Sequence, residues 1–297
     1  MWNWLTLTFD YLAESLRVVD WKLAVPVAGS LMAAFFGAYT AQRIIERREI
    51  RQKLSREIRN ANVATTLSLH IANAFIGMKK QHIKQLYDNY HRSKAEVVQA
   101  LKEPLPGGQR PEFRYRADLE HLPTLELPTE HLQRIVADEI SVTGRPLLLP
   151  TMIRQVVRSQ IDAVNVRNRM IDEFKKADLP HNDFATLYFG LRGPRGVDNI
   201  YGTTIDAINA YTNDCIYFSI RLSEDLAAHA RGLQQRYADQ YRDKPPSVAT
   251  ADFSKVEEGL LPSRVDYADW EKMAPKPVAE KVFTRRFWRR WTERPAT

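Results

Sequence analysis

The chain has 297 residues and a formal net charge of +7, and 44% of its residues are hydrophobic. Its single cysteine, Cys215, excludes a disulfide framework and paired-cysteine metal sites. The sequence contains no Ser-His-Asp arrangement, no dinucleotide fingerprint and no kinase motif set. We therefore expect a non-enzymatic protein that uses no cofactor and no metal.

An uncharged run from Leu23 to Ala41 is the most informative feature of the chain. About 19 residues, rising about 1.5 Å each, are just enough to cross a hydrocarbon core of about 30 Å. The run is preceded by Lys22 and followed by Arg43, Arg47, Arg48, Arg51, Lys53, Arg56 and Arg59. The pattern predicts a single-pass protein of the plasma (inner) membrane, with the N-terminus outside and the body after the run in the cytoplasm. The alternatives are a buried core helix and a cleaved signal peptide, whose leader would be shorter.

Small residues recur along this run at every fourth position, at Gly29, Ala33, Gly37 and Ala41. Such a face lets two helices approach closely in lipid, which predicts a homo-oligomer or a partner membrane protein. Residues 1–22 carry apolar side chains at helical spacing and tryptophans near both ends. They predict an interfacial amphipathic segment on the bilayer, although a helix packed on a partner membrane subunit has the same pattern.

After the run, residues 42–242 predict a cytoplasmic helical bundle. A long helix should continue to Glu103, with a seven-residue seam typical of a coiled coil or a bundle: Leu69, Ile76, Ile83, Tyr90 and Val97. Prolines and glycines then give a connection over residues 103–128, and further helices are expected at 130–142, 151–176 and 203–241. No long alternating strand pattern interrupts them. The fold class is therefore all-α, with the long helix as a member of the bundle.

Within the connection, Arg116 and His121 have the R-x4-H spacing of a nuclease motif, and the pair resembles that of HEPN-type helical ribonucleases. In that family the two residues lie on helices and meet at a dimer interface. Here they lie between prolines, and Ala117 replaces the polar residue that usually follows the arginine. The resemblance covers two residues and implies at most a tethered ribonuclease.

A glycine- and arginine-rich stretch between residues 187 and 204 is the best candidate ligand site. Flexible backbone N–H groups, guanidinium groups and a helix N-terminus all favour an anion such as phosphate. A Gly-Pro connection with solvated arginines explains the stretch equally well. The candidate ligand-binding residues are Arg192, Gly193, Arg195, Gly196 and Thr203.

The C-terminal part is predicted to be a Pro-rich, mostly irregular linker at 243–277, followed by a basic amphipathic helix at 278–294. The aromatic and basic side chains of that helix fall on opposite sides, which favours the anionic lipid bilayer as its partner. Nucleic acid is the second choice. The residues expected at the membrane surface are Arg285, Arg286, Phe287, Trp288, Arg289, Arg290 and Trp291.

Together these features predict a membrane-anchored helical scaffold, receptor or switch that assembles through its span and its bundle. A competing hypothesis is an effector that senses a phosphate-bearing ligand at Arg192 and Arg195 and then alters membrane integrity, by analogy with bacterial defence effectors. The third hypothesis is the tethered ribonuclease that uses Arg116 and His121.

Overall fold

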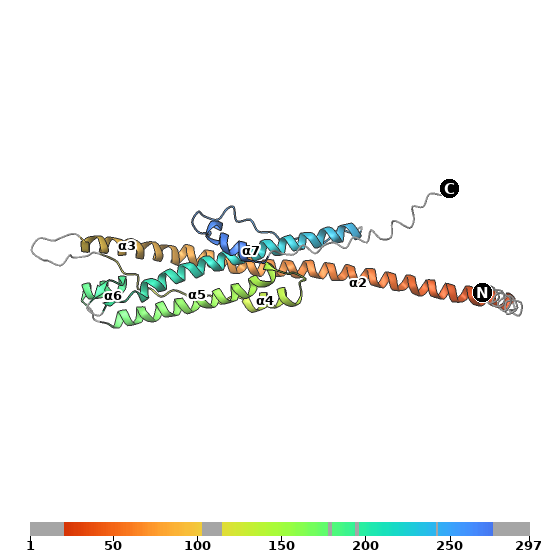
Figure 1. The fold of residues 1–297 in the computed structure, drawn as a ribbon, viewed down its shortest axis with the longest axis horizontal. Coiled ribbons are helices and arrows are strands. Elements are labelled where there is room, and N and C mark those ends of the chain that lie inside the picture. The colour runs from red at the N-terminus through yellow and green to blue at the C-terminus, as the bar shows by residue number, and fades with distance from the viewer. Residues whose placement is uncertain (1–20, 103–114, 178–179, 194–195, 242, 276–297) are drawn as a thin grey trace, which may run out of the picture. The chain divides into compact units, whose positions relative to one another are not determined.

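The computed structural model describes residues 21–102, 115–177, 180–193, 196–241 and 243–275. The chain divides into two units, residues 1–56 and residues 57–297, and its described part is mostly helical (Figure 1). The prediction of an all-α chain with a helical bundle is confirmed. The strands in the described residues are the two-residue pair β1 (Arg192–Gly193) and β2 (Gly196–Val197). The predicted helix 278–294 and most of the predicted segment 1–22 lie outside the described residues.

The long helix that the sequence predicts is present and begins at the edge of the described residues. It consists of α2 (Trp21–Met78), a π-helical turn η1 (Lys79–Ile83) and α3 (Lys84–Lys102), which follow one another without a break. The sequence pattern does not reveal the π turn, since the apolar seam continues through it. Of the predicted seam, Ile83, Tyr90 and Val97 are buried.

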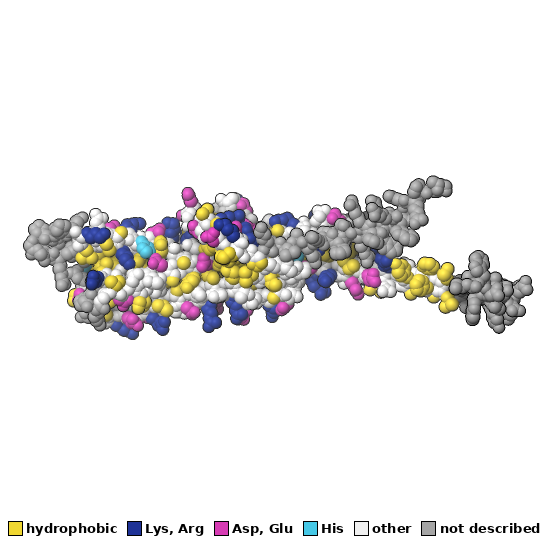
Figure 2. Space-filling model, in the orientation of Figure 1, with side chains coloured by type: hydrophobic (Ala, Val, Ile, Leu, Met, Phe, Trp, Pro, Cys, Tyr) yellow, Lys and Arg dark blue, Asp and Glu magenta, His cyan; other side chains and the backbone are white. Residues whose placement is uncertain are grey.

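In the first unit, the described part of α2 exposes many large apolar side chains, which gather at its N-terminal end (Figure 2). They are Leu31, Met32, Phe35, Phe36, Tyr39, Ile44, Ile45 and Ile50. Among the described residues, however, no helix combines the length and the apolar character that crossing a membrane requires. By this criterion the predicted span at 23–41 is not supported.

The second unit is built around two long helices, α5 (Arg145–Lys176) and α7 (Ile200–Gln240), which pack along each other. Helix α4 (Thr129–Asp138) packs on α5, and α6 (His181–Phe189) packs on α7. Every core position that periodicity predicts for α7 is buried: Ile205, Ile208, Thr212, Cys215, Ser219, Leu222, Leu226 and Leu233. The 3.6-residue period therefore identifies the face of α7 that the bundle covers.

Two boundaries differ from the predictions because prolines and glycines act differently in their tertiary context. Helix α5 begins six residues before the predicted Thr151, since Pro146 occupies the first turn, where its missing N–H costs little, and Pro150 is accommodated one turn later. Helix α6 was not predicted. It ends at Gly190, whose φ of 63° lets its N–H bond back to the last turn.

The predicted irregular segment after α7 has little regular structure, but it packs on the bundle. It contains a 3₁₀ turn, η3 (Arg264–Tyr267), and a short helix, α8 (Ala268–Met273). The Tyr267 ring stacks on that of Tyr217 at 3.7 Å, and buried Lys79 donates a hydrogen bond to the Leu260 carbonyl at 3.0 Å. Residues 243–275 are therefore part of the second unit.

Candidate functional site

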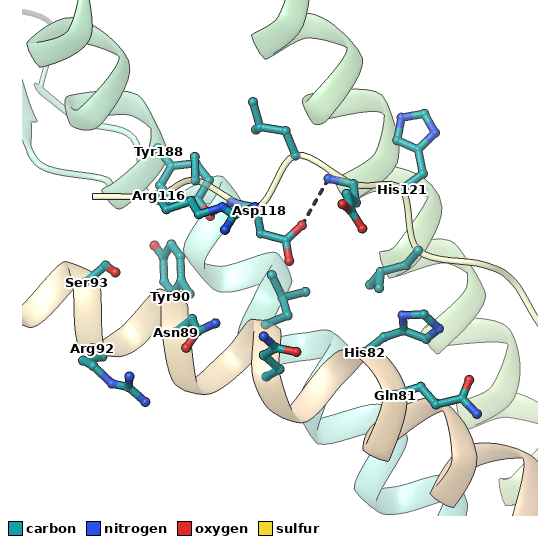
Figure 3. Close-up of a pocket in the computed structure, with 16 residues that line it drawn as sticks. Gln81, His82, Asn89, Tyr90, Arg92, Ser93, Arg116, Asp118, His121 and Tyr188 are labelled. Carbon is teal, nitrogen blue, oxygen red and sulfur yellow. Dashed lines mark hydrogen bonds between the residues drawn. The ribbon is translucent and has the colours of Figure 1, made fainter. Parts of the chain in front are cut away.

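A polar groove of about 500 Å³ lies in the second unit, between the η1–α3 helix and the segment Arg116–Leu122 (Figure 3). One wall is helical and the other is a length of chain without regular secondary structure. Helical and irregular segments that are distant in sequence meet in this groove, which is our candidate functional site.

The helical wall carries a row of short polar side chains that are each four residues apart: Gln81, Gln85, Asn89 and Ser93. Four residues are slightly more than one helical turn, so the row follows one side of the helix. Buried Leu86 and Tyr90 lie beside this row and anchor the wall to the core. The row begins in the π turn, a kind of irregularity that is frequent at functional sites.

The opposite wall of the groove is held to α5 through hydrogen bonds to the backbone of the wall. Asn168 uses both ends of its amide on Leu122: its oxygen accepts from the Leu122 N–H at 3.0 Å, and its nitrogen donates to the Leu122 carbonyl at 2.9 Å. This pairing reproduces the two hydrogen bonds of a neighbouring strand. The segment is therefore fixed although no strand lies beside it.

Arg167 fixes the centre of the same segment. Its side chain is fully buried, and its guanidinium group donates to the Glu120 carbonyl at 2.8 Å and to the Asp118 carbonyl at 3.2 Å. It also contacts the carboxylate of Asp118 at 3.3 Å, and it lies 5.9 Å from the centre of the Tyr201 ring. A buried guanidinium needs such partners because burying an unpaired charge is costly.

An aromatic cluster supports this end of the groove. The Tyr188 hydroxyl accepts the Asp118 N–H at 3.1 Å, and the ring of Tyr188 contacts those of Tyr90, Tyr115 and Tyr201. Burial raises the pKa of Tyr115 to about 12 and raises the pKa of Tyr90 still further. These hydroxyls stay neutral near pH 7. The Tyr115 hydroxyl donates to the His181 carbonyl at 3.2 Å, whereas the Tyr90 hydroxyl is buried without a hydrogen-bond partner among the described residues.

The two residues of the R-x4-H pair both line the groove, but the structure does not place them as a nuclease pair would lie. They belong to the extended segment rather than to a helix. Arg116 lies near Tyr188, whereas the His121 ring points toward α5, where its Nε2 is 3.0 Å from Asp172 Oδ1 (Figure 3). Within the described residues, neither His121 nor His82 hydrogen-bonds Ser93, the hydroxyl in the wall. The groove is thus lined mainly by side chains that can form hydrogen bonds.

The predicted anion-binding residues are only partly described. Arg192 is exposed in β1, and Gly193 pairs with Gly196 across the hairpin. Thr203 is exposed and donates its hydroxyl to the Asn199 carbonyl at 2.9 Å. Arg195 lies outside the described residues, so anion binding at this loop stays a prediction.

The predicted association residues, Gly29, Ala33, Gly37 and Ala41, are all exposed on α2. A side chain added at Gly29 or Gly37 would meet nothing within 4 Å in the described structure. The predicted membrane-surface residues between Arg285 and Trp291 lie outside the described residues. Among the described residues, no group of three or more metal-ligating side chains could hold an ion.

A second polar cluster joins three distant parts of the chain at the start of the second unit. The buried carboxylate of Glu57 accepts hydrogen bonds from the Ser141 N–H at 2.9 Å and from the Ser141 hydroxyl, and it lies 3.1 Å from His229 Nε2. Burial alone would raise the pKa of Glu57, but the hydrogen bonds from His229 and Ser141 outweigh it and lower the pKa to about 2. The carboxylate lies between the hydroxyl and the imidazole, so it does not form a nucleophilic triad.

Sequence reasoning missed the residues that build the groove, although two signals were available. Arg167 falls on the apolar stripe of α5 between Val164 and Ile171, and a charged residue at a core position indicates a buried partner. The four-residue spacing of the amide side chains Gln81, Gln85 and Asn89, the amide row, was also visible in the sequence.

Comparison with known proteins gives no relative: no family model, no curated protein and no solved structure matches the chain.

Proposed function

We propose that the protein is a non-enzymatic helical scaffold of the plasma membrane. Its N-terminal helix associates with other copies in the bilayer, and its body, from residue 57 onward, binds partners in the cytoplasm. Support comes from the exposed apolar surface of α2, the basic residues that follow it and the bundle with a polar groove.

The observation that carries this proposal is the exposure of large apolar side chains in the first unit. Leu31 is 66% exposed, Phe35 is 69% exposed and Phe36 is 58% exposed. Contiguous apolar surface of this kind marks contact with a membrane or with another protein. The uncharged run around it and the arginines after it favour the membrane.

Association of several α2 helices explains how a run that is only weakly apolar can anchor the chain in the bilayer. The large residues Leu31 and Phe35 lie on one side of α2, and the small residues Gly29, Ala33 and Gly37 lie on the other, at about 100° per residue. Helices that pair through their small faces exclude lipid from those faces and present the large side chains outward. The proposed anchor is therefore an oligomer of α2 helices rather than one isolated helix.

Extraction of native membranes tests the attachment. We expect the full chain to remain in the membrane pellet after alkaline carbonate and to be released by mild detergent. A C-terminal tag should be protected from protease in intact cells and cleaved in inverted vesicles. Release of the chain by carbonate alone would refute membrane attachment.

Cross-linking in detergent tests the assembly. Gly29→Ile and Gly37→Ile should reduce the oligomer, because they separate the helix backbones while keeping the run apolar. Leu31→Ile and Phe35→Ile, on the side of the large residues, are matched controls that should leave the oligomer unchanged. Equal oligomer size in both pairs of variants would show that the small residues do not mediate helix association.

A tethered ribonuclease is the second candidate, and one observation favours it: Arg116 and His121 line the same groove. It predicts RNA cleavage by the purified chain that His121→Ala abolishes. The phosphate-sensing effector predicts that nucleotides raise the melting temperature and that changing Arg192 and Arg195 to Ala removes this shift. Both activities are measured on the full chain in mild detergent.

A further inference from the structure

Along the extended wall of the groove, the backbone N–H and C=O groups of every second residue make no hydrogen bond within the described residues. The backbone groups of Asp118, Glu120 and Leu122 are engaged by side chains, mainly those of Arg167 and Asn168. Within the described residues, the N–H and C=O groups of the alternate positions make no hydrogen bond: Ala117, Leu119 and His121.

This alternation gives the segment a free edge. In an extended chain, the backbone groups of successive residues point to opposite sides. The carbonyl groups of Asp118 and Glu120 and both backbone groups of Leu122 bond to Arg167 and Asn168 on α5. The Asp118 N–H bonds instead to Tyr188 of α6, and the Glu120 N–H bonds to the carboxylate of Asp118. Most engaged groups therefore face α5, and the free groups of the alternate residues face away from it. The η1–α3 helix and the groove lie on that side of the segment (Figure 3). An unpaired edge of this kind is a template for another extended chain.

The facing helical wall offers polar groups at a matching spacing. The row from Gln81 through Gln85 and Asn89 repeats about every 6 Å, because four residues of helix rise 1.5 Å each. An extended chain presents backbone groups to one side about every 6.7 Å. A chain in the groove could therefore pair with the free edge on one side and with the amide row on the other.

We propose that this groove binds an extended peptide segment of a partner protein. The segment adds as a strand along Ala117–His121, and its outer backbone groups bond to Gln81, Gln85 and Asn89. The inference names the partner class of the proposed scaffold and rests on that role, but it does not depend on membrane attachment.

Charge on the extended wall specifies the chemistry of the segment. Arg116 is exposed and Glu120 is exposed, and within the described residues neither forms an ion pair. Four residues of extended chain separate them by about 13 Å. The bound segment should carry a carboxylate near Arg116 and a cation about four residues away, near Glu120.

A phage-displayed library of random dodecapeptides, panned on the full chain in mild detergent, tests the proposal. Enriched peptides should share an acidic and a basic residue four positions apart. Gln85→Trp, which fills the groove, should weaken their binding at least about tenfold. Glu96→Trp, exposed on the same helix outside the groove, is the matched control and should leave binding unchanged.

Two further measurements separate backbone pairing from other contacts. N-methylation of alternate amides should abolish binding for the set that faces the free edge, since those amides then cannot donate. Bound peptide should slow hydrogen exchange at Ala117, Leu119 and His121. Arg116→Glu should change the preferred acidic residue to a basic one.

The proposal is overturned if panning enriches no peptide, if enriched peptides bind Gln85→Trp as well as the unaltered chain, or if N-methylation has no effect. Slower exchange of the same amides with oligouridylate, together with no peptide binding, would assign the groove to RNA and also overturn it. Peptide binding with a chain that carbonate releases from membranes would support the groove and refute the membrane attachment separately.

Discussion

Replacing Arg167 by Met should loosen the extended wall of the groove. The Met side chain keeps much of the apolar contact of the arginine stem, but it cannot donate to the Glu120 and Asp118 carbonyls, now 2.8 Å and 3.2 Å away. These carbonyls would lose a charged donor at a buried site. Arg169→Met, two residues later on the exposed side of α5, is the matched control.

The expected loss follows from the separate contacts of Arg167. Hydrogen bonds from a charged donor contribute about 1.5 to 3 kcal/mol each. The ion pair with half-exposed Asp118 adds little, because solvent screens it. The Arg167 Nε is buried without a partner, and removing it returns roughly 1 to 3 kcal/mol. The two hydrogen bonds less the returned penalty give a net destabilisation between about 0 and 5 kcal/mol, and the central value that we expect is about 2.5 kcal/mol.

Urea unfolding of the full chain in mild detergent measures this loss, and hydrogen exchange locates it. Exchange at residues 116–122 should rise most in Arg167→Met, since that guanidinium group fixes this segment. Arg169→Met should stay within about 0.5 kcal/mol of the unaltered chain. If the two variants have the same stability and the same exchange at 116–122, Arg167 does not hold the wall.

Three more changes test other parts of the fold. The pKa of Glu57 is lowered from 4.5 to about 2, so the ionised carboxylate stabilises the fold by about 3 kcal/mol. This stabilisation should be complete above pH 4.5 and disappear as the pH falls toward 2. Glu57→Gln should remove this part of the pH dependence of unfolding, and an unchanged profile would refute the reasoning. Gly202→Ala should lower the melting temperature, because the added Cβ would lie 2.4 Å from the Tyr90 hydroxyl. Gly232→Ala, on the same helix in open space, should raise the melting temperature slightly. Equal shifts in the two variants would contradict the close contact between Gly202 and Tyr90. Asp225→Asn breaks a buried ion pair with α5 and should cost about 3 to 5 kcal/mol in urea unfolding, and a loss below about 1 kcal/mol would show that the pair is already solvated.

Helix identity and core faces were predictable from local pattern alone. On α7, positions from Ile205 to Leu233 recur at threes and fours and are buried, because only one side of a helix can face the bundle. Helix ends were less predictable. The sequence predicted a start for α5 at Thr151, but α5 begins at Arg145 and accommodates Pro150.

The candidate site was predictable only in fragments. The sequence singled out Arg116 and His121 by their spacing, and both line the groove, yet the Arg167 and Asn168 bonds that shape it link positions about 50 residues apart. Local periodicity carries no information on such pairings. The π turn also stayed hidden, since the apolar seam runs through it.

The sequence by itself determined the helical class, the apolar faces, the uncharged run of α2 and its basic flank, because each depends on residues close together along the chain. Only the tertiary structure decided that an extended segment lies against α5, that its free edge faces an amide row on η1 and α3, and that residues 243–275 pack on the bundle. The physical reason is that buried polar groups must find partners wherever the fold brings them, and those partners are distant in sequence.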